Sequence, residues 1–266
     1  MLEVENLVVE YNAKERKRVL DNITFTLSKQ KAVIVGPNGS GKSTFLKAIL
    51  GLVPIKEGRV MVFGNNVKNV KNEVRVSSNL LEVYELVNLS VKDIIFLYAD
   101  LKRANADEVL TKIKEVEVES ILKSKPWRLS TGQQKIFGNV MALSMNSKLA
   151  LLDEPFEGID QVRRKKIAQM IQEFDGEIVM VTHEFDVLLK YFKDWPLYFM
   201  IEGKLAGGFR VSDIPRIYMN REEKPGYISK INTRYGTLSF TLNEGEVSLT
   251  SATNWEGIFE KISGEL

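Results

Sequence analysis

Apolar and polar residues follow two different patterns in the first part of this chain. Residues 2–10 and 19–27 alternate apolar and polar side chains, which predicts two half-exposed β-strands joined by a charged turn. Residues 31–35 form an apolar run of the kind found in strands buried on both faces. The pattern therefore predicts a β-rich start that leads into a buried sheet.

Helical periodicity and short apolar strands alternate in the rest of the main part of the chain. The expected helices lie at 44–50, across about 91–122, at 130–144 and at 161–174, and further strands lie at 58–63, 149–152 and 178–182. Because fully apolar strands that alternate with helices form parallel sheets covered on both faces, the fold class is α/β.

The pattern changes again beyond about Asn220. Short alternating strands are expected at 227–233, 237–242 and 246–250, followed by a final helix near 254–262. We therefore expect a main domain at 1–219, with a helical subdomain at about 80–140, and a small C-terminal α+β extension at 220–266.

Composition excludes several kinds of chemistry. The 266 residues include no Cys and one His, so a disulfide framework, a zinc ribbon, an iron–sulfur cluster and a thiol nucleophile are excluded. The net charge of +2 does not favour nucleic-acid binding, and the basic clusters at 14–18 and 163–166 are expected to be a solvated turn and an exposed helix face. Since the apolar stretches are far shorter than the roughly 20 residues that cross a bilayer, and no signal-peptide pattern is visible, we expect neither a membrane span nor a leader.

The strongest candidate for chemistry is the glycine-rich segment Gly36-Pro-Asn-Gly-Ser-Gly41-Lys42-Ser43-Thr44 between the buried strand and the first helix. It matches the P-loop pattern, in which backbone N–H groups and the helix dipole bind phosphates. Lys42 would reach the β- and γ-phosphates and Ser43 would ligate Mg²⁺. The residues assigned to ATP binding in this segment are Gly36, Pro37, Asn38, Gly39, Ser40, Gly41, Lys42, Ser43 and Thr44.

Two carboxylates and the histidine complete a predicted hydrolysis site. Asp153 and Glu154 follow the buried strand at 149–152, and their side chains face different directions. Asp153 is predicted to hold Mg²⁺ through its water shell, and Glu154 to polarise the attacking water. His183 follows the strand at 178–182, so it is expected at the same carboxyl edge of the sheet, where it could donate to the γ-phosphate.

Leu129-Ser130-Thr131-Gly132-Gln133 resembles the signature of ATP-binding cassette (ABC) ATPases, with Thr131 in place of the first Gly. The resemblance covers about residues 1–215. It implies a P-loop NTPase with an antiparallel β subdomain, a RecA-like parallel sheet core and a helical subdomain. It also implies that Ser130, Gly132 and Gln133 contact ATP bound to an opposite subunit in a head-to-tail homodimer or heterodimer around two ATP and Mg²⁺.

The same resemblance assigns three more residues. Tyr11 lies where the family has the aromatic side chain that stacks on adenine, and Gly158-Ile159-Asp160 resembles the D-loop that crosses the dimer interface. Asn79 lies where the family has a Gln that senses Mg²⁺ and the attacking water. Asn is one methylene shorter, so the loop lies closer, a water bridges the gap, or the loop lies elsewhere.

The resemblance further implies an ATPase that drives a separate transmembrane permease from the cytoplasmic face of the membrane. Fewer than a hundred residues separate the P-loop from the signature, which argues against the long coiled coils of DNA-repair relatives. The stretches 86–96 and 253–264 resemble exporter cassettes, so an exporter is the main expectation. An importer subunit and a soluble regulatory ATPase without a transport role remain as alternatives.

Overall fold

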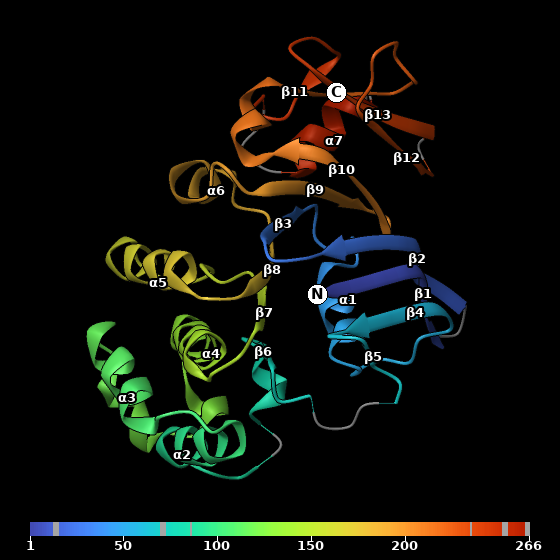
Figure 1. Ribbon diagram of the computed structural model, residues 1–266. Coiled ribbons are helices and arrows are strands. Elements are labelled where there is room, and N and C mark those ends of the chain that lie inside the picture. Colours follow the sequence, from blue (N-terminus) through green and yellow to red (C-terminus); the bar gives the residue numbers. More distant parts are fainter. Residues whose placement is uncertain (13–15, 70–72, 86, 235, 252–254, 264–266) are drawn as a thin grey trace. The chain divides into compact units, whose positions relative to one another are not determined.

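The computed structural model describes residues 1–12, 16–69, 73–85, 87–234, 236–251 and 255–263. The chain forms two compact units: unit 1 comprises Met1–Val70 with Val181–Leu266, and unit 2 comprises Lys71–Met180 (Figure 1). Within the described part of the chain, every helix is too short or too polar to cross a membrane. The exporter-like stretches include residues 86, 253, 254 and 264, and the basic turn includes residues 14 and 15, which lie outside the described residues.

Unit 1 begins with an antiparallel sheet of strand order β2-β1-β4-β5. Its strands are β1 (Leu2–Asn12), β2 (Arg16–Leu27), β4 (Glu57–Val62) and β5 (Asn65–Asn66). The alternating pattern correctly predicted β1 and β2, and β4 matches the strand expected at 58–63. The register between β1 and β2 shifts around Asn6, whose φ of 47° lies in the left-handed region. Because of this bulge, the fully buried residues of β1 change from even-numbered to odd-numbered positions, from Val4 to Leu7 and Val9.

The second sheet segment of unit 1 carries the P-loop. The predicted strand β3 (Lys31–Val35) is present and pairs in parallel with β9 (Pro196–Ile201). Helix α1 (Lys42–Ile49) begins two residues before the expected position. Strand β9 pairs antiparallel with β10 (Lys204–Arg210), and this hairpin was not predicted because the apolar run in β9 was considered only as a membrane span.

The C-terminal part of unit 1 is a four-stranded antiparallel sheet of order β12-β13-β11-β14. Its elements are β11 (Ile217–Asn220), β12 (Ser229–Thr233), β13 (Gly236–Leu242), β14 (Val247–Ser248) and helix α7 (Trp255–Ser263). Strand β11 was not predicted, so this sheet starts a few residues before the expected change at Asn220. The ring of Phe240 stacks on Phe199 of β9 with a centroid distance of 4.6 Å and an interplanar angle of 6°, which fastens the extension to β9.

Unit 2 holds most of the helices. The long helical stretch expected at 91–122 is divided into α2 (Val91–Lys102) and α3 (Ala106–Glu115) by Arg103, which has a φ of 52°. Each of these helices starts at a side-chain cap, Ser90 and Asn105 respectively. The other helices are α4 (Thr131–Ser144) and α5 (Gln161–Glu173), with short 3₁₀ turns at Leu81–Val83, Glu119–Lys123 and Pro126–Arg128.

Two parallel strands form the sheet of unit 2, β6 (Val76–Ser78) and β7 (Leu149–Asp153). All five residues of β7 are buried, as its apolar sequence predicted. Strand β8 (Glu177–Thr182) carries the chain from unit 2 into unit 1, where α6 (Phe185–Tyr191) follows. Parallel pairs in both units, together with the antiparallel strands and the helices, make this an α/β protein, as the sequence predicted.

Candidate functional site

The loop between β3 and α1 has the geometry of a phosphate-binding loop. Gly39 and Gly41 have φ values of 75° and 105°, which L-residues with side chains rarely adopt. A Cβ on Gly36 would lie 2.1 Å from the carbonyl oxygen of Met200, so no larger residue fits there. Glycine is therefore required at this loop both for backbone conformation and for close approach to β9.

Lys42 and Ser40 are the polar side chains buried in this loop. The Lys42 ammonium donates to the carbonyl oxygens of Gly36 and Pro37 at 2.7 and 3.0 Å, so the loop closes around it. Ser40 is 3% exposed, and its Oγ has no hydrogen-bond partner among the described residues. A buried hydroxyl without a partner is costly, and a phosphate oxygen is the kind of group that would satisfy it. The chemistry of the loop therefore fits a phosphorylated ligand.

A cavity of about 610 Å³ lies beside this loop, entirely within unit 1. It is lined by residues 17–19, 37–40, 201–203, Arg234 and Phe259. This volume lies within the range of about 300–1,000 Å³ that is usual for small-molecule sites. Of these residues, the sequence assigned only 37–40 to ligand binding. It expected Lys17 and Arg18 in a solvated turn and gave no binding role to the remaining lining residues.

The predicted adenine contact and the histidine lie on the surface of unit 1. Tyr11 is opposite Lys17 in the β1–β2 ladder and is 39% exposed. Lys17 lines the cavity, whereas Tyr11 is not one of the lining residues. His183 follows β8 directly and is exposed. The roles assigned to Tyr11 and His183 stay predictions.

The acidic pair lies at the end of β7 in unit 2. Asp153 is 8% exposed, and its Oδ1 has no hydrogen-bond partner among the described residues. Glu154 is half-buried and has a φ of 44°, an uncommon conformation that marks a sharp turn directly after the strand. A buried carboxylate oxygen without a partner suits a cation or its bound water. The donor set at Asp153 therefore fits Mg²⁺.

Asn79 follows β6 and has a different set of contacts from the one predicted. Its Oδ1 accepts from the backbone N–H of Asp153 at 2.7 Å. Its Nδ2 donates to the carbonyl oxygen of Asp153 at 3.1 Å and to Oδ1 of Asn139 at 2.9 Å. Since the side chain is 3% exposed and both amide groups are engaged, these contacts favour a bracing role at the end of β7 over direct ligation of Mg²⁺. The prediction that Asn79 ligates Mg²⁺ and contacts ATP is not supported by these hydrogen bonds.

Helix α4 supplies the other half of this bracing network. Nδ2 of Asn139 donates to the carbonyl oxygen of Pro155 at 2.6 Å, and Nζ of Lys135 donates to the carbonyl oxygen of Asp153 at 2.8 Å. The spacing of four residues places these two side chains on one helix face. Sequence reasoning missed both residues, although this spacing after the signature was the available signal.

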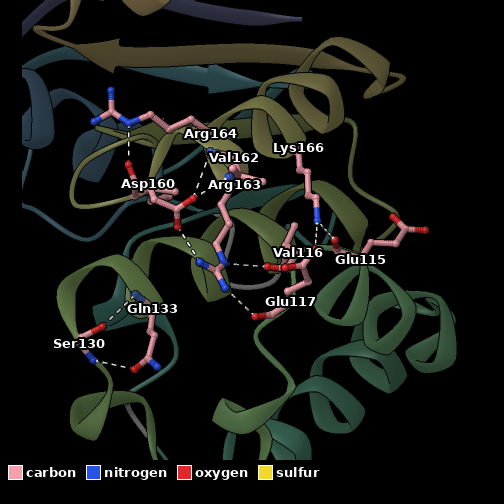
Figure 2. Close-up of polar contacts among 11 residues, drawn as sticks. Glu115, Val116, Glu117, Ser130, Gln133, Asp160, Val162, Arg163, Arg164 and Lys166 are labelled. Atoms are coloured by element: carbon pink, nitrogen blue, oxygen red, sulfur yellow. Dashed lines mark hydrogen bonds and ion pairs between the residues drawn. The ribbon is translucent and has the colours of Figure 1, made fainter.

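The signature residues form the start of α4. Ser130 caps the helix in a capping box, in which its Oγ accepts from the N–H of Gln133 at 3.4 Å and Gln133 Oε1 accepts from the N–H of Ser130 at 3.0 Å (Figure 2). A Cβ on Gly132 would lie 2.2 Å from the carbonyl oxygen of Gly158, so the signature and the D-loop-like turn are in close contact within unit 2. Ser130 is exposed at a helix N-terminus, where an anion is favoured.

Asp160 caps α5 rather than projecting freely. Its Oδ1 accepts from the backbone N–H groups of Val162 and Arg163, both at 3.1 Å, and its Oδ2 pairs with Nη1 of Arg163 at 2.7 Å (Figure 2). The hydrogen bond from the Arg163 side chain lowers the pKa of Asp160 below its ordinary value. The role of Asp160 across a dimer interface stays a prediction. In the single chain, its side chain is already held by its own helix.

The basic cluster at 163–166 is more than the solvated helix face that the sequence predicted. Arg163 donates to the carbonyl oxygens of Val116 and Glu117, both at 3.0 Å, and Lys166 donates to the carbonyl oxygen of Glu115 at 2.7 Å (Figure 2). These carbonyls lie at the C-terminal end of α3, where cations are favoured. The expectation was wrong for these two side chains, because the partners come from a helix that is distant in the sequence.

No group of three His, Asp or Glu residues in the described part of the chain could by itself hold a metal ion. The assignment of Mg²⁺ to Ser43 and Asp153 stays a prediction from the sequence. Mg²⁺ commonly keeps several waters and binds through one or two carboxylates together with substrate phosphates, so its binding does not need such a group.

Comparison with protein families gives a match over residues 20–157 to the family described as ABC transporter. The chain is 32% identical over 206 residues to the manganese transport system ATP-binding protein of Listeria monocytogenes, an alignment that covers 73% of this chain and 84% of that protein. It is also 32% identical over 199 residues to the molybdate/tungstate import ATP-binding protein of Pyrococcus horikoshii, covering 71% of this chain and 56% of that protein.

Among solved structures, one named as a candidate cobalt transport ATP-binding protein is similar over 98% of this chain and 100% of its own. Its TM-score is 0.89 and its sequence identity is 32%. The two sequence relatives align over less than three quarters of this chain. The similarity to the cobalt-transport structure therefore includes the C-terminal extension.

Proposed function

This chain belongs to the ABC transporter family of ATP-hydrolysing subunits, and we propose that it powers an importer by closing around ATP with a second subunit. The sequence favoured an exporter and kept the importer as its alternative. The relatives are named for manganese transport and for molybdate or tungstate import, and the structural neighbour for cobalt transport. These names support the importer alternative better than the exporter.

The observation that supports the ATP chemistry best is the loop around Lys42. Its ammonium donates to two loop carbonyls, and the neighbouring Ser40 hydroxyl is buried without a partner among the described residues. We propose that phosphate oxygens replace those carbonyls as the acceptors of Lys42 and accept from Ser40. The exchange would couple nucleotide binding to a change in the loop itself.

The acidic turn would carry the hydrolytic step. Mg²⁺, when bound, supplies positive charge that neutralises the phosphate oxygens during transfer. Asp153 and Ser43 would hold the cation, Glu154 would orient and polarise the attacking water, and His183 would donate a hydrogen bond to the γ-phosphate. Glu154 suits this role because it is half-buried at the sharp turn that directly follows β7.

The helix-start residues of the signature would act on the nucleotide of the opposite subunit. Ser130 is exposed at the N-terminus of α4, and Gly132 leaves the backbone there open to close approach. When the signature of one subunit contacts the ATP of the other, the change would reach the acidic turn of the same subunit. It would pass through the contact of Gly132 with Gly158 and through Asp160, which caps α5. The partner subunit is either a second copy or a related chain.

We further propose that the subunit sits at the cytoplasmic face of the membrane on separate permease subunits. The helical region near residues 80–99 is the candidate contact, because it follows Asn79 directly, and Asn79 is hydrogen-bonded to the acidic turn. The permease would recognise the transported substrate, and nucleic acid is not an expected partner.

Hydrolysis is tested with Glu154→Gln. We expect retained ATP binding, a turnover at least about 100-fold slower and an ATP-trapped dimer, because a general base contributes about that much or more. Turnover at the wild-type rate would show that Glu154 is not the base. The control variant Glu173→Gln changes an exposed carboxylate at the far end of α5 and should keep its turnover.

Direction is tested in cells with labelled manganese, cobalt and molybdate. An importer predicts that Glu154→Gln lowers uptake of one of them, whereas an exporter predicts increased retention. Co-purification in detergent with the product of a neighbouring membrane-protein gene separates both from a soluble regulatory ATPase, which would retain only soluble partners.

A further inference from the structure

The cavity beside the P-loop is lined by residues from distant parts of the chain. Loop residues 37–40 and residues 17–19 of β2 line it. Arg234, between β12 and β13, and Phe259 of α7 also line it. Both of the latter belong to the C-terminal extension, to which the P-loop chemistry assigns no role.

Hydrogen bonds connect the extension to the P-loop through the β9–β10 turn. Arg234 pairs with Glu202 through Nε at 2.9 Å and donates its backbone N–H to Glu202 Oε2 at 2.8 Å. The next residue, Gly203, donates its N–H to the carbonyl oxygen of Ser40 at 2.9 Å. Lys204 adds a bond from Nζ to the carbonyl oxygen of Asn232 at 2.7 Å. The hairpin that carries Arg234 is thus fixed relative to the loop.

Aromatic packing fixes Phe259 in the same way. Its ring lies 6.1 Å from that of Trp255, which is 3% exposed. Trp255 in turn contacts Phe185 of α6 at 5.5 Å and Phe199 of β9 at 6.2 Å. Because β9 borders the P-loop strand β3, the position of Phe259 is determined by the core of unit 1.

The lining of the cavity has the chemistry of a nucleotide site. Lys17, Arg18 and Arg234 are cationic and Glu202 is the acidic lining residue, so the formal charge of these four is +2. Arg18 also pairs with Asp21 at 2.7 Å and with Glu10 at 3.5 Å, two carboxylates outside the lining. Phe259 supplies an aromatic surface on the side of the extension. A ligand with a polyanionic end and a flat aromatic end would satisfy both.

We propose that the C-terminal extension is part of the ATP-binding pocket, with Phe259 contacting the base and Arg234 the anionic part of the nucleotide. This inference rests on the proposed function, since it takes the phosphates to be held by the P-loop. It assigns an aromatic base contact in addition to Tyr11, which is not among the lining residues. It also gives the extension a direct role in nucleotide affinity.

Calorimetric titration of the full chain with ATP and with inorganic tripolyphosphate, both with Mg²⁺, tests this. Phe259→Ala should raise the Kd for ATP about tenfold and leave that for tripolyphosphate unchanged, because loss of stacking on an aromatic side chain affects only the base. Arg234→Gln should raise both Kd values. Tyr227→Ala and Arg216→Gln are matched controls outside the cavity lining, since Arg216 is likewise an exposed Arg paired with one carboxylate.

Phe259→Leu keeps the apolar packing of α7 and removes only the ring, so it replaces the Ala variant if that variant unfolds. An ATP Kd equal to wild type in the folded Phe259 variant would overturn the base contact, and wild-type Kd values in Arg234→Gln would overturn the anionic contact. Lys42→Ala distinguishes the failures. If Lys42→Ala binds neither ATP nor tripolyphosphate while the Phe259 and Arg234 variants bind both as wild type does, the proposed function stands and this inference falls. A wild-type chain that binds neither ligand would refute the proposed function itself.

Discussion

Replacing Asn79 by Asp separates a bracing role from a metal-ligand role, because Asp has the same shape and no donor. In the wild type, Nδ2 of Asn79 donates to Asn139 Oδ1 at 2.9 Å and to the carbonyl oxygen of Asp153 at 3.1 Å. In the variant an oxygen would face both acceptors inside a site where residue 79 is 3% exposed. The change therefore converts two hydrogen bonds into two repulsive contacts.

The magnitude follows from these contacts. Each lost hydrogen bond removes about 1 kcal/mol, and Oδ1 of Asn139, left without its donor, costs a further ~1 kcal/mol or more. The carbonyl oxygen of Asp153 keeps the hydrogen bond from Lys135, so we expect a loss of about 3 kcal/mol. For a chain of this size the loss corresponds to a decrease in Tm on the order of 10 °C. Thermal unfolding measured by circular dichroism without nucleotide or Mg²⁺ detects it, and hydrogen exchange should localise it to β7 and α4.

The outcome differs if Asn79 is instead a Mg²⁺ ligand. Aspartate is at least as good a ligand, so Asn79→Asp would then keep the wild-type Tm in the absence of metal and bind Mg²⁺ and ATP at least as well. That result would refute the bracing argument. Asn65→Asp in β5 is a suitable control, because Asn65 is exposed and the same charge change there should leave Tm nearly unchanged.

Three further predictions concern the same unit. Gly138→Ala should lower Tm even though Ala favours helices by about 1 kcal/mol, because its Cβ would lie 2.4 Å from the carbonyl oxygen of Asn79; an unchanged or raised Tm would contradict this contact. Ser130→Ala should cost about 1 kcal/mol in denaturant unfolding through loss of the capping box, with Ser130→Asp, also a good cap, retaining stability. Burial lowers the pKa of Lys102 from 10.5 to about 8, so between these pH values the unfolded chain binds more protons than the folded chain. The free energy of unfolding of wild type relative to Lys102→Met should therefore rise with pH, by up to about 1.4 kcal/mol per pH unit. A difference that stays constant from about pH 8 to 10 would show that the pKa is not lowered.

Local sequence determined the elements that carry the chemistry. The apolar runs at β3 and β7 correctly predicted buried strands, because a strand covered on both faces needs apolar residues at every position. The glycines of the P-loop correctly indicated a phosphate-binding type of loop, since its backbone angles and close contacts exclude larger side chains. The apolar runs and the backbone angles depend on neighbours in the sequence, so pattern alone was sufficient for them, whereas the contact of Gly36 with the carbonyl oxygen of Met200 exists only in the folded chain.

The partners of individual side chains were decided only by the tertiary structure. Asn79 matched a family position, yet its amide is hydrogen-bonded to the end of β7 and to Asn139, which lies 60 residues further along the chain. The basic cluster in α5 pairs with carbonyls of the α3 end for the same reason. Periodicity indicates that a residue faces inward or outward, and does not indicate which distant group it meets.

The C-terminal extension shows this division most clearly. Its alternating residues predicted short strands and a final helix, which are present as β12, β13, β14 and α7. Nothing in that pattern placed Arg234 and Phe259 at the cavity beside the P-loop, which lies at least 190 residues earlier in the chain. The placement depends on the stacking of Phe240 on Phe199 and on the ion pair of Arg234 with Glu202, contacts that exist only after the chain has folded. The sequence by itself thus determined which chemistry this protein carries, and tertiary packing decided which residues surround it.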